Sequence, residues 1–498
     1  MSRNLAELLA SSVAARPAAL LAVDDERTTL EQAYEQATAA AAGLHAAGHG
    51  PGTRLALVMT NSLEFLVAWM AGVLSGAEVA LVNPAYPDDL LREMFAVLAP
   101  RAVLVDAAGR GRDHGVAVLD ASEVRSAGLR DDRGRPLPAG GTPLGIERAA
   151  SDIAGFMHTS GTSGAPKFCA QSHRYHLALG DFVRELFEIG PDDAVFAPLP
   201  LFHVNPLGYG LLGALSGSAD FHSARRFSVS GYWPRVVRDR ASVLILHGAP
   251  LSLLKQHADP AGARGHRVRS SFFGDHDFME RFSVPGCVTA YGSTEAGGIA
   301  HTRRWQRGEA ATAPEGQLRE AGSPRPGFEW RLDAGAETDG GAPGEILIRA
   351  ADPDELFSGY ATRDGVVSRL DPDGWFATGD LGRRDADGSL VFVERAAESV
   401  RVKGEYIPLD HLEGRLAGAL GRSVCAWKRV GVDGDELVVY VEGEPDLDRY
   451  ALVRDELPGF MRPAAFAVVE ALPRDTGVGK VQRRRLGETA VRRWVESR

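Results

Sequence analysis

The sequence predicts an α/β fold, in which a large N-terminal domain of parallel-sheet α/β subdomains and a β subdomain precedes a small α+β C-terminal domain. Three observations predict this arrangement. In residues 1–150, short apolar runs alternate with helical patterns, which is typical of a parallel sheet with helices on both faces. Residues 327–393 contain short strand-like runs separated by turn residues, which favours a mostly β subdomain. The length of 498 residues also exceeds what one hydrophobic core usually supports.

The first half of the chain contains the buried strands and helices of this prediction. The most apolar stretch, residues 65–82, includes Glu78 and two glycines, so we expect a buried helix followed by a strand rather than a membrane span. The middle part of residues 106–145 is rich in Gly, Arg and Asp and is expected to be a surface loop. Apolar runs predict strands at residues 55–59, 78–82, 102–105, 194–201 and 242–246, and periodicity predicts helices at residues 30–47 and 88–98.

The sequence pattern changes after Arg395, where the short strand-like runs of the β subdomain end. A helical pattern at residues 409–420 and an apolar run at 436–441 indicate a separate α+β unit of about one hundred residues. We therefore place the large domain at residues 1–394 and the small domain at residues 395–498.

Composition excludes several classes of protein. The net charge of −11 argues against an extended nucleic-acid surface. The chain does not begin with a basic segment and an apolar run, so a signal peptide is not expected. Cys169, Cys287 and Cys425 lie far apart without metal-ligand spacing, and we expect them to be reduced, buried thiols. These features predict a cytoplasmic protein with no nucleic-acid partner and no membrane span, and they leave a homodimer open.

One segment has the composition of an anion-binding loop. Its hydroxyl residues and glycines can turn backbone N–H groups toward a bound anion, and its last residue adds a positive charge. The spacing is not that of a Walker loop, because no Gly-Lys-Ser/Thr follows at the required distance. The segment is Thr159-Ser160-Gly161-Thr162-Ser163-Gly164-Ala165-Pro166-Lys167, and it suits a polyphosphate.

This loop resembles the phosphate-binding signature of the adenylate-forming superfamily, which includes acyl- and aryl-CoA synthetases, peptide-synthetase adenylation domains and luciferases. Further segments resemble family motifs in the same order, over roughly residues 50–490. The order makes a chance match very improbable. The segments are Asn83-Pro84, the acid-side Pro198-Leu199-Pro200-Leu201-Phe202-His203, the adenylate-side Tyr291-Gly292-Ser293-Thr294-Glu295, the ribose-side Gly374-Trp375-Phe376-Ala377-Thr378-Gly379-Asp380, Glu394-Arg395 before a hinge, and Gly479-Lys480-Val481.

The resemblance implies an enzyme that activates a small-molecule acid with ATP and Mg²⁺, and a role for each matched residue. Glu295 would bind Mg²⁺, Thr294 would bond the α-phosphate, and Lys480 would lie between carboxylate and α-phosphate. His203 would form a gate or wall of the acid pocket, although a histidine in a core is a competing interpretation. The remaining nucleotide-binding positions would be Gly274, Tyr291, Gly292, Asp380 and Arg395, with Asp380 and Arg395 on the ribose, and Lys403-Gly404 resembles plant-type aryl-CoA ligases.

The acceptor of the activated acid is less narrowly defined. In the family, rotation of a small mobile C-terminal domain admits the thiol of coenzyme A for the second step. This chain departs from the usual pattern at Phe168, in the short segment beginning at Gly274, at the hinge residue Ala397, and in one extra residue before Lys480. The first hypothesis is therefore an acid–CoA ligase for an aromatic or short- to medium-chain acid. The alternative is an adenylating ligase of specialised metabolism, with an amine or carrier protein as acceptor, or with nitrite activated for diazotisation. A third hypothesis, an inactive binding subunit, is disfavoured because Lys167, Glu295, Asp380 and Lys480 are all present.

Overall fold

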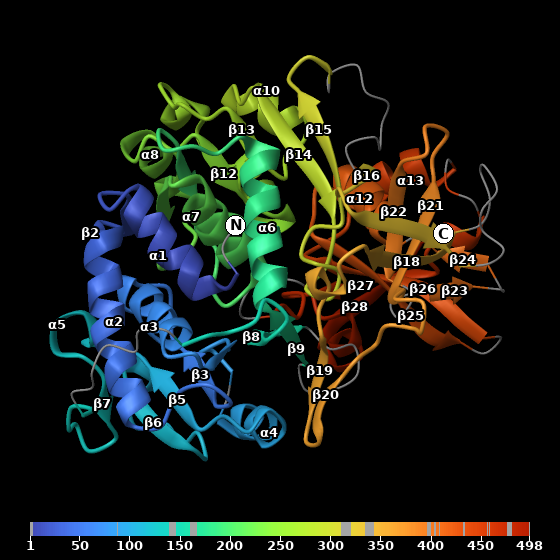
Figure 1. Cartoon of the computed structure of the whole chain (residues 1–498). Coiled ribbons are helices and arrows are strands. Elements are labelled where there is room, and N and C mark those ends of the chain that lie inside the picture. The colour runs from blue at the N-terminus through green and yellow to red at the C-terminus, as the bar shows by residue number, and fades with distance from the viewer. Residues whose placement is uncertain are drawn as a thin grey trace. The chain divides into compact units, whose positions relative to one another are not determined.

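Two mixed sheets with central parallel strands form the framework of the first of two units (Figure 1). The computed structural model describes residues 3–86, 88–138, 146–159, 167–309, 320–333, 343–395, 400–402, 405–407, 409–431, 434–455, 457, 459–475 and 481–497. By their contacts, residues 1–330 and 347–377 form the first compact unit, and residues 331–346 and 378–498 form the second. The domain boundary between residues 394 and 395 stays a prediction.

The first sheet of this unit runs in the order β16-β15-β14-β13-β12-β10-β11-β1-β2. Strands β1, β11, β10, β12, β13 and β14 pair in parallel, as the alternating pattern predicts. The strands are β1 (Leu20–Val23), β2 (Glu26–Thr29), β10 (Ala194–Phe196), β11 (Asp220–Ser223), β12 (Val243–Ile245), β13 (Ser270–Phe272), β14 (Gly286–Tyr291), β15 (His301–Gln306) and β16 (Glu320–Pro324).

The second sheet has nine strands in the order β20-β19-β9-β8-β4-β3-β5-β6-β7. Its parallel centre carries an antiparallel extension, in which β8 pairs with β9 and β9 with β19. The strands are β3 (Arg54–Val58), β4 (Glu78–Leu81), β5 (Ala102–Val105), β6 (Ala117–Asp120), β7 (Arg130–Asp131), β8 (Ile153–Thr159), β9 (Lys167–Ser172), β19 (Gly359–Thr362) and β20 (Gly365–Val367).

Helices cover these sheets and pack with them in several apolar clusters, the largest of which is a core with residues from both sheets. Leu57 on β3, Leu66 on α3, Val183 on α6 and Val195 on β10 are all fully buried in this core, and burial of this kind is the main favourable term in folding. The helices of the first unit are α1 (Leu5–Ala15), α2 (Leu30–Ala46), α3 (Leu63–Leu74), α4 (Asp88–Leu98), α5 (Val124–Ala127), α6 (His173–Phe187), α7 (Gly213–Gly217), α8 (Val229–Arg238), α9 (Gly248–His257) and α10 (His276–Phe282), with the π-helix η2 (Asn205–Leu212).

The second unit contains a small α+β fold, as the sequence predicts. Its four-stranded sheet runs β25-β26-β27-β28, and Leu412 and Leu416 on α12 pack with Val439 and Phe466 of that sheet. Its elements are β21 (Phe376–Arg384, which begins in the first unit), β22 (Leu390–Arg395), β23 (Val400–Val402), β24 (Glu405–Ile407), α12 (Leu409–Leu420), β25 (Val424–Gly431), β26 (Gly434–Glu442), α13 (Leu447–Arg454), β27 (Ala465–Val469) and β28 (Val491–Glu496). Strands β17 (Phe328–Leu332) and β18 (Gly344–Ala350) confirm the predicted β-rich segment.

The expected surface loop in residues 106–145 is wrong in part. Strand β6 lies there and extends the parallel sheet beside β5, and α5 and β7 follow it. Four residues of strand between Gly- and Arg-rich turns produce almost no periodic signal, so the strand depends on pairing with β5 rather than on its own sequence.

The predicted helix-then-strand at residues 65–82 is confirmed by α3 and β4. Among the described residues, every helix is too short or too polar to cross a bilayer. The three cysteines are free thiols and all are buried.

Two buried histidines on α6 predict a pH-dependent stability. Burial, and next the neighbouring His173, lower the pKa of His176 to about 3, and burial lowers the pKa of His173 to about 4. Because the unfolded chain protonates these groups near pH 6.5 and the folded chain only near pH 3–4, stability present above pH 6.5 is lost as the pH falls toward 4. His176→Leu should reduce this loss by about 1.4 kcal/mol per pH unit. Urea unfolding at several pH values between 7 and 4.5 measures the free energy of unfolding of wild type and variant. If that free energy falls with pH as steeply in His176→Leu as in wild type, the assignment is contradicted.

Candidate active site

A β-hairpin holds the two ends of the candidate phosphate loop. Strand β8 ends at Thr159 and β9 begins at Lys167, and these two residues are register partners. Antiparallel partners lie about 5 Å apart, so the hairpin brings the loop's two ends together and leaves the Lys167 side chain exposed. The five loop positions predicted to bind phosphate, Ser160, Gly161, Thr162, Ser163 and Gly164, lie outside the described residues.

The adenylate-side motif forms a tight turn after β14. Tyr291 ends that strand and is buried. A β-carbon on Gly292 would lie 2.0 Å from the carbonyl oxygen of Gly298, a contact that no other residue type could make. The Ser293 carbonyl accepts the N–H groups of Ala296 and Gly298 at 3.1 and 3.0 Å. Glycine at the second position of the motif is therefore a requirement of the turn.

Groups from two other elements hold Thr294 and Glu295. The Tyr175 hydroxyl of α6 donates to the Thr294 carbonyl at 3.0 Å, and the Phe357 N–H donates to the Glu295 carbonyl at 3.1 Å. The Tyr360 hydroxyl of β19 donates to Glu295 Oε1 at 2.9 Å. Backbone and carboxylate of Glu295 are thus both fixed, as preorganised sites require.

A partly buried ion network holds the segment that supplies Phe357. Arg325 Nη2 lies 2.9 Å from Glu355 Oε2, and Arg174 at the start of α6 pairs with Glu355 and, at 2.8 Å, with Asp352. Burial lowers the pKa of Arg325, and the Glu355 carboxylate opposes that shift. Removing one member of such a network leaves another charge uncompensated, so the network fixes residues 352–355 against α6.

The predicted acid-side residue His203 lies in a group of rings. Its ring centroid is 4.6 Å from that of Phe202 and 5.7 Å from that of His158. The N–H of Asn83, part of a predicted motif, donates to His158 Nε2 at 3.3 Å. Burial, and next His203, lower the pKa of His158 to about 3, so this histidine is neutral at pH 7. The π-helix η2 begins two residues after His203, and such helices occur frequently at functional sites.

Gly274 follows β13 at a close contact. A β-carbon there would lie 2.6 Å from the Cys287 β-carbon, and the preceding Phe273 has a left-handed φ of 60°. Backbone strain of this kind often marks a functional segment. Glycine at residue 274 is explained by packing on β14.

Asp380 belongs to the second unit. It is buried on β21, opposite Arg395 of β22, and its N–H donates to Thr378 Oγ1 at 3.1 Å. The Gly379 N–H donates to Glu345 Oε1 at 2.8 Å. The strand pair therefore brings the two predicted ribose-binding positions together at the backbone level. Lys403, Gly404 and Lys480 lie outside the described residues.

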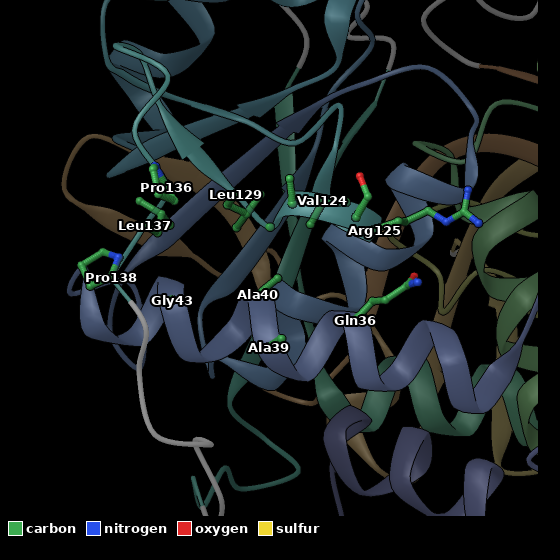
Figure 2. Close-up of a pocket in the computed structure, with 13 residues that line it drawn as sticks. Gln36, Ala39, Ala40, Gly43, Val124, Arg125, Leu129, Pro136, Leu137 and Pro138 are labelled. Atoms are coloured by element: carbon green, nitrogen blue, oxygen red, sulfur yellow. The ribbon is translucent and has the colours of Figure 1, made fainter.

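A separate pocket of about 250 Å³ lies between α2 and residues 124–138 (Figure 2). Gln36 and Ala40 line it from α2, and Val124, Leu129 and Leu137 line it from the facing segment. Its lining includes none of the predicted site residues, so we do not place the candidate site there.

Comparison with known proteins decides the family. The model of the AMP-binding enzyme family matches residues 9–361, most of the chain. The chain belongs to the AMP-binding enzyme family. It is an adenylate-forming ligase of the acid–CoA ligase type, as the motifs predict.

Two curated relatives of this AMP-binding enzyme are acid–CoA ligases. A medium/long-chain-fatty-acid–CoA ligase of Mycobacterium tuberculosis is 26% identical over 91% of this chain and 80% of its own length. A crotonobetaine/carnitine–CoA ligase of Proteus mirabilis is 27% identical over 69% of this chain and 67% of its own.

The fold is also found in solved structures. O-succinylbenzoate coenzyme A synthetase from Bacillus subtilis in complex with AMP has a TM-score of 0.82 at 20% identity, covering 97% of this chain and 98% of that one. The same enzyme with ATP and magnesium ion has a TM-score of 0.81 at 20% identity, covering 96% and 99%. At this identity the likeness confirms the α/β fold class.

Sequence reasoning missed Tyr360. It is 65 residues from Glu295 along the chain and belongs to none of the quoted motifs. The pairing of β19 with β9 brings Tyr360 close to Glu295. A motif of neighbouring residues in the sequence does not predict a contact between such distant segments.

Proposed function

We propose that this protein uses ATP and Mg²⁺ to convert a small carboxylic acid, aromatic or of short to medium chain length, into an acyl-adenylate, and then transfers the acyl group to coenzyme A. In the first step, a carboxylate oxygen attacks the α-phosphorus and pyrophosphate leaves. In the second step, the thiol sulfur attacks the acyl carbon and AMP leaves.

One observation carries the proposal within the first unit. Lys167, from the candidate phosphate loop, and Glu295, from the adenylate-side turn, contact the same side chain, Tyr360. A cation for phosphate and a carboxylate for a metal are the two charges that phosphoryl transfer needs near each other. The two motifs are far apart in the sequence, so this convergence supports one shared site.

The described side chains suit Mg²⁺, which needs few protein ligands, better than a metal ion that is coordinated by protein side chains alone. Among the described residues, no group of three or more His, Cys, Asp or Glu side chains could enclose an ion. Mg²⁺ is usually held by one or two carboxylates together with substrate phosphates, and Glu295 supplies one carboxylate. A carboxylate can accept about four hydrogen bonds, so the bond from Tyr360 leaves Glu295 able to bind a metal. When bound, Mg²⁺ would neutralise charge on the phosphates.

The other predicted residues complete the proposed site. Thr294 would bond the α-phosphate, Asp380 the ribose hydroxyls, and Arg395 the ribose side of the nucleotide. Lys480 would stabilise negative charge between the carboxylate and the α-phosphate. We propose that the domain of residues 395–498 rotates next to Arg395 before the second step, as a hinge of few residues permits.

The ring group near His203 supports a small or aromatic acid. The ring centroids of Phe202, His158 and His203 lie 4.6 to 5.9 Å from one another, and aromatic rings pair favourably with other flat rings at such distances. The acids in the names of the two curated relatives, a medium- or long-chain fatty acid and crotonobetaine or carnitine, support a carboxylic acid as the substrate and do not favour one chain length.

Pyrophosphate release tests this function. We would measure release from ATP and Mg²⁺ with aliphatic acids, aryl acids and nitrite, each with and without coenzyme A. We expect release that depends on one class of organic acid, together with an acyl-CoA product. Pyrophosphate release without an acyl-CoA product, or release that occurs only with nitrite or an added amine, would mean that coenzyme A is not the acceptor. No release with any acid would contradict the proposal.

A further inference from the structure

Tyr360 contacts three charged side chains of the first unit. Its hydroxyl donates to Glu295 Oε1 at 2.9 Å. Lys167 Nζ lies 5.2 Å from the ring centroid, and the Arg369 guanidinium carbon lies 5.8 Å from it. Both distances are within the range of a cation–π interaction. The two ends of this side chain thus contact the candidate metal ligand and the candidate phosphate-binding lysine.

The strand register explains why these groups meet. Tyr360 on β19 is the partner of Cys169 on β9, and Lys167 precedes Cys169 by two residues. Residues two apart on a strand point to the same face, so Tyr360 is the diagonal neighbour of Lys167, within reach of a long side chain. On the other strand of the hairpin, Thr159 is opposite Lys167. A shift of one residue in the β19–β9 pairing would turn Tyr360 to the opposite face.

The Tyr360 ring packs against a second aromatic ring. The buried Phe357 ring packs edge-on against it with centroids 5.0 Å apart, and the Phe357 N–H bonds the Glu295 carbonyl. The hydroxyl on this ring is the donor to Glu295 Oε1 at 2.9 Å. A fixed donor of this kind selects one orientation of the carboxylate.

We propose that Tyr360 is a positioning residue that holds the Glu295 carboxylate for Mg²⁺ and the Lys167 ammonium for the ATP phosphates in one arrangement. The inference rests on the proposed function, since it assigns Tyr360 to the same ATP site. The hydroxyl serves the metal ligand and the ring serves the lysine, so the two roles can be separated by substitution.

Two variants separate them. Tyr360→Phe keeps the ring beside Lys167 and removes only the bond to Glu295. Its ATP affinity without metal should stay within about twofold of wild type, while the Mn²⁺ affinity of the protein–ATP complex falls about 10- to 100-fold, as for other residues that orient metal ligands. Tyr360→Leu removes both contacts, and its metal-free ATP affinity should also fall, by about threefold or more. Titration calorimetry measures ATP binding, and electron paramagnetic resonance measures Mn²⁺ binding.

The matched control is Tyr232→Phe. Tyr232 is fully buried in a different part of the core, and its hydroxyl is without a hydrogen-bond partner among the described residues. This variant should keep wild-type affinity for both ATP and Mn²⁺. Wild-type Mn²⁺ affinity in Tyr360→Phe, or an equal loss in Tyr232→Phe, would overturn the role of Tyr360. Wild-type protein that binds no ATP would instead overturn the proposed function, so the two failures are distinguishable.

Discussion

Replacing Lys480 with alanine should slow acyl-adenylate formation by about 10²–10³ while ATP binding stays close to that of wild type. The reason is that Lys480 is proposed to lie between the attacking carboxylate and the α-phosphate, where negative charge develops only in the transition state. Removing one preorganised group of this kind typically slows the reaction by about 10²–10³. Binding of ATP in the ground state is proposed to depend on other residues, so it should change little. Single-turnover formation of the adenylate and titration with ATP measure the two quantities.

The control for this variant is another lysine of the second unit. The sequence contains five lysines, and Lys428 is exposed on β25. Lys428→Ala should form the adenylate at the wild-type rate. A wild-type rate in Lys480→Ala would remove Lys480 from the reaction. Loss of ATP binding together with activity would show that Lys480 binds the ground state and not mainly the transition state.

Replacing Glu295 with glutamine should reduce acid-dependent pyrophosphate release by about 10²–10³. The amide has the shape of the carboxylate, and its oxygen can still accept the Tyr360 hydroxyl, so the turn after β14 should be retained. It lacks the negative charge that a hard cation prefers. The rate should therefore need much more Mg²⁺ than wild type to reach half its maximum, and a titration of rate against Mg²⁺ concentration measures this.

A surface carboxylate provides the comparison. Glu185 on α6 is exposed, with 65% of its side chain accessible, and Glu185→Gln should leave the Mg²⁺ titration unchanged. If Glu295→Gln has the wild-type response to Mg²⁺, Glu295 does not bind the metal. If it is inactive at every Mg²⁺ concentration and also unfolded by circular dichroism, the loss lies in the turn and the metal assignment fails.

Much of the fold is predictable because local sequence patterns indicate its helices and strands. The apolar stretch of α3 followed by β4, and the strand–helix alternation around β3 and β5, have lengths and periods that few other structures share. Strands β6 and β9 were not predicted. Their stability comes from neighbours in the sheet, and pairing between distant segments leaves little signal in any one segment.

The candidate site is predictable to a different degree. The motifs around Lys167, Glu295 and Asp380 can be found because the residues proposed to bind one group lie close together in sequence. The register of β19 against β9, which places Tyr360, depends on how two remote strands align. The roles of all these residues stay predictions, and Lys480 and Lys403 also lie outside the described residues.

The transfer of labelled oxygen tests the central claim most directly. The accepted acid would be supplied with ¹⁸O in its carboxylate, and AMP would be analysed by mass spectrometry after reaction with ATP, Mg²⁺ and coenzyme A. If the carboxylate attacks the α-phosphorus and the thiol then attacks the acyl carbon, AMP keeps one labelled oxygen. We predict AMP carrying one ¹⁸O atom. Unlabelled AMP, or ADP in its place, would contradict an acyl-adenylate intermediate.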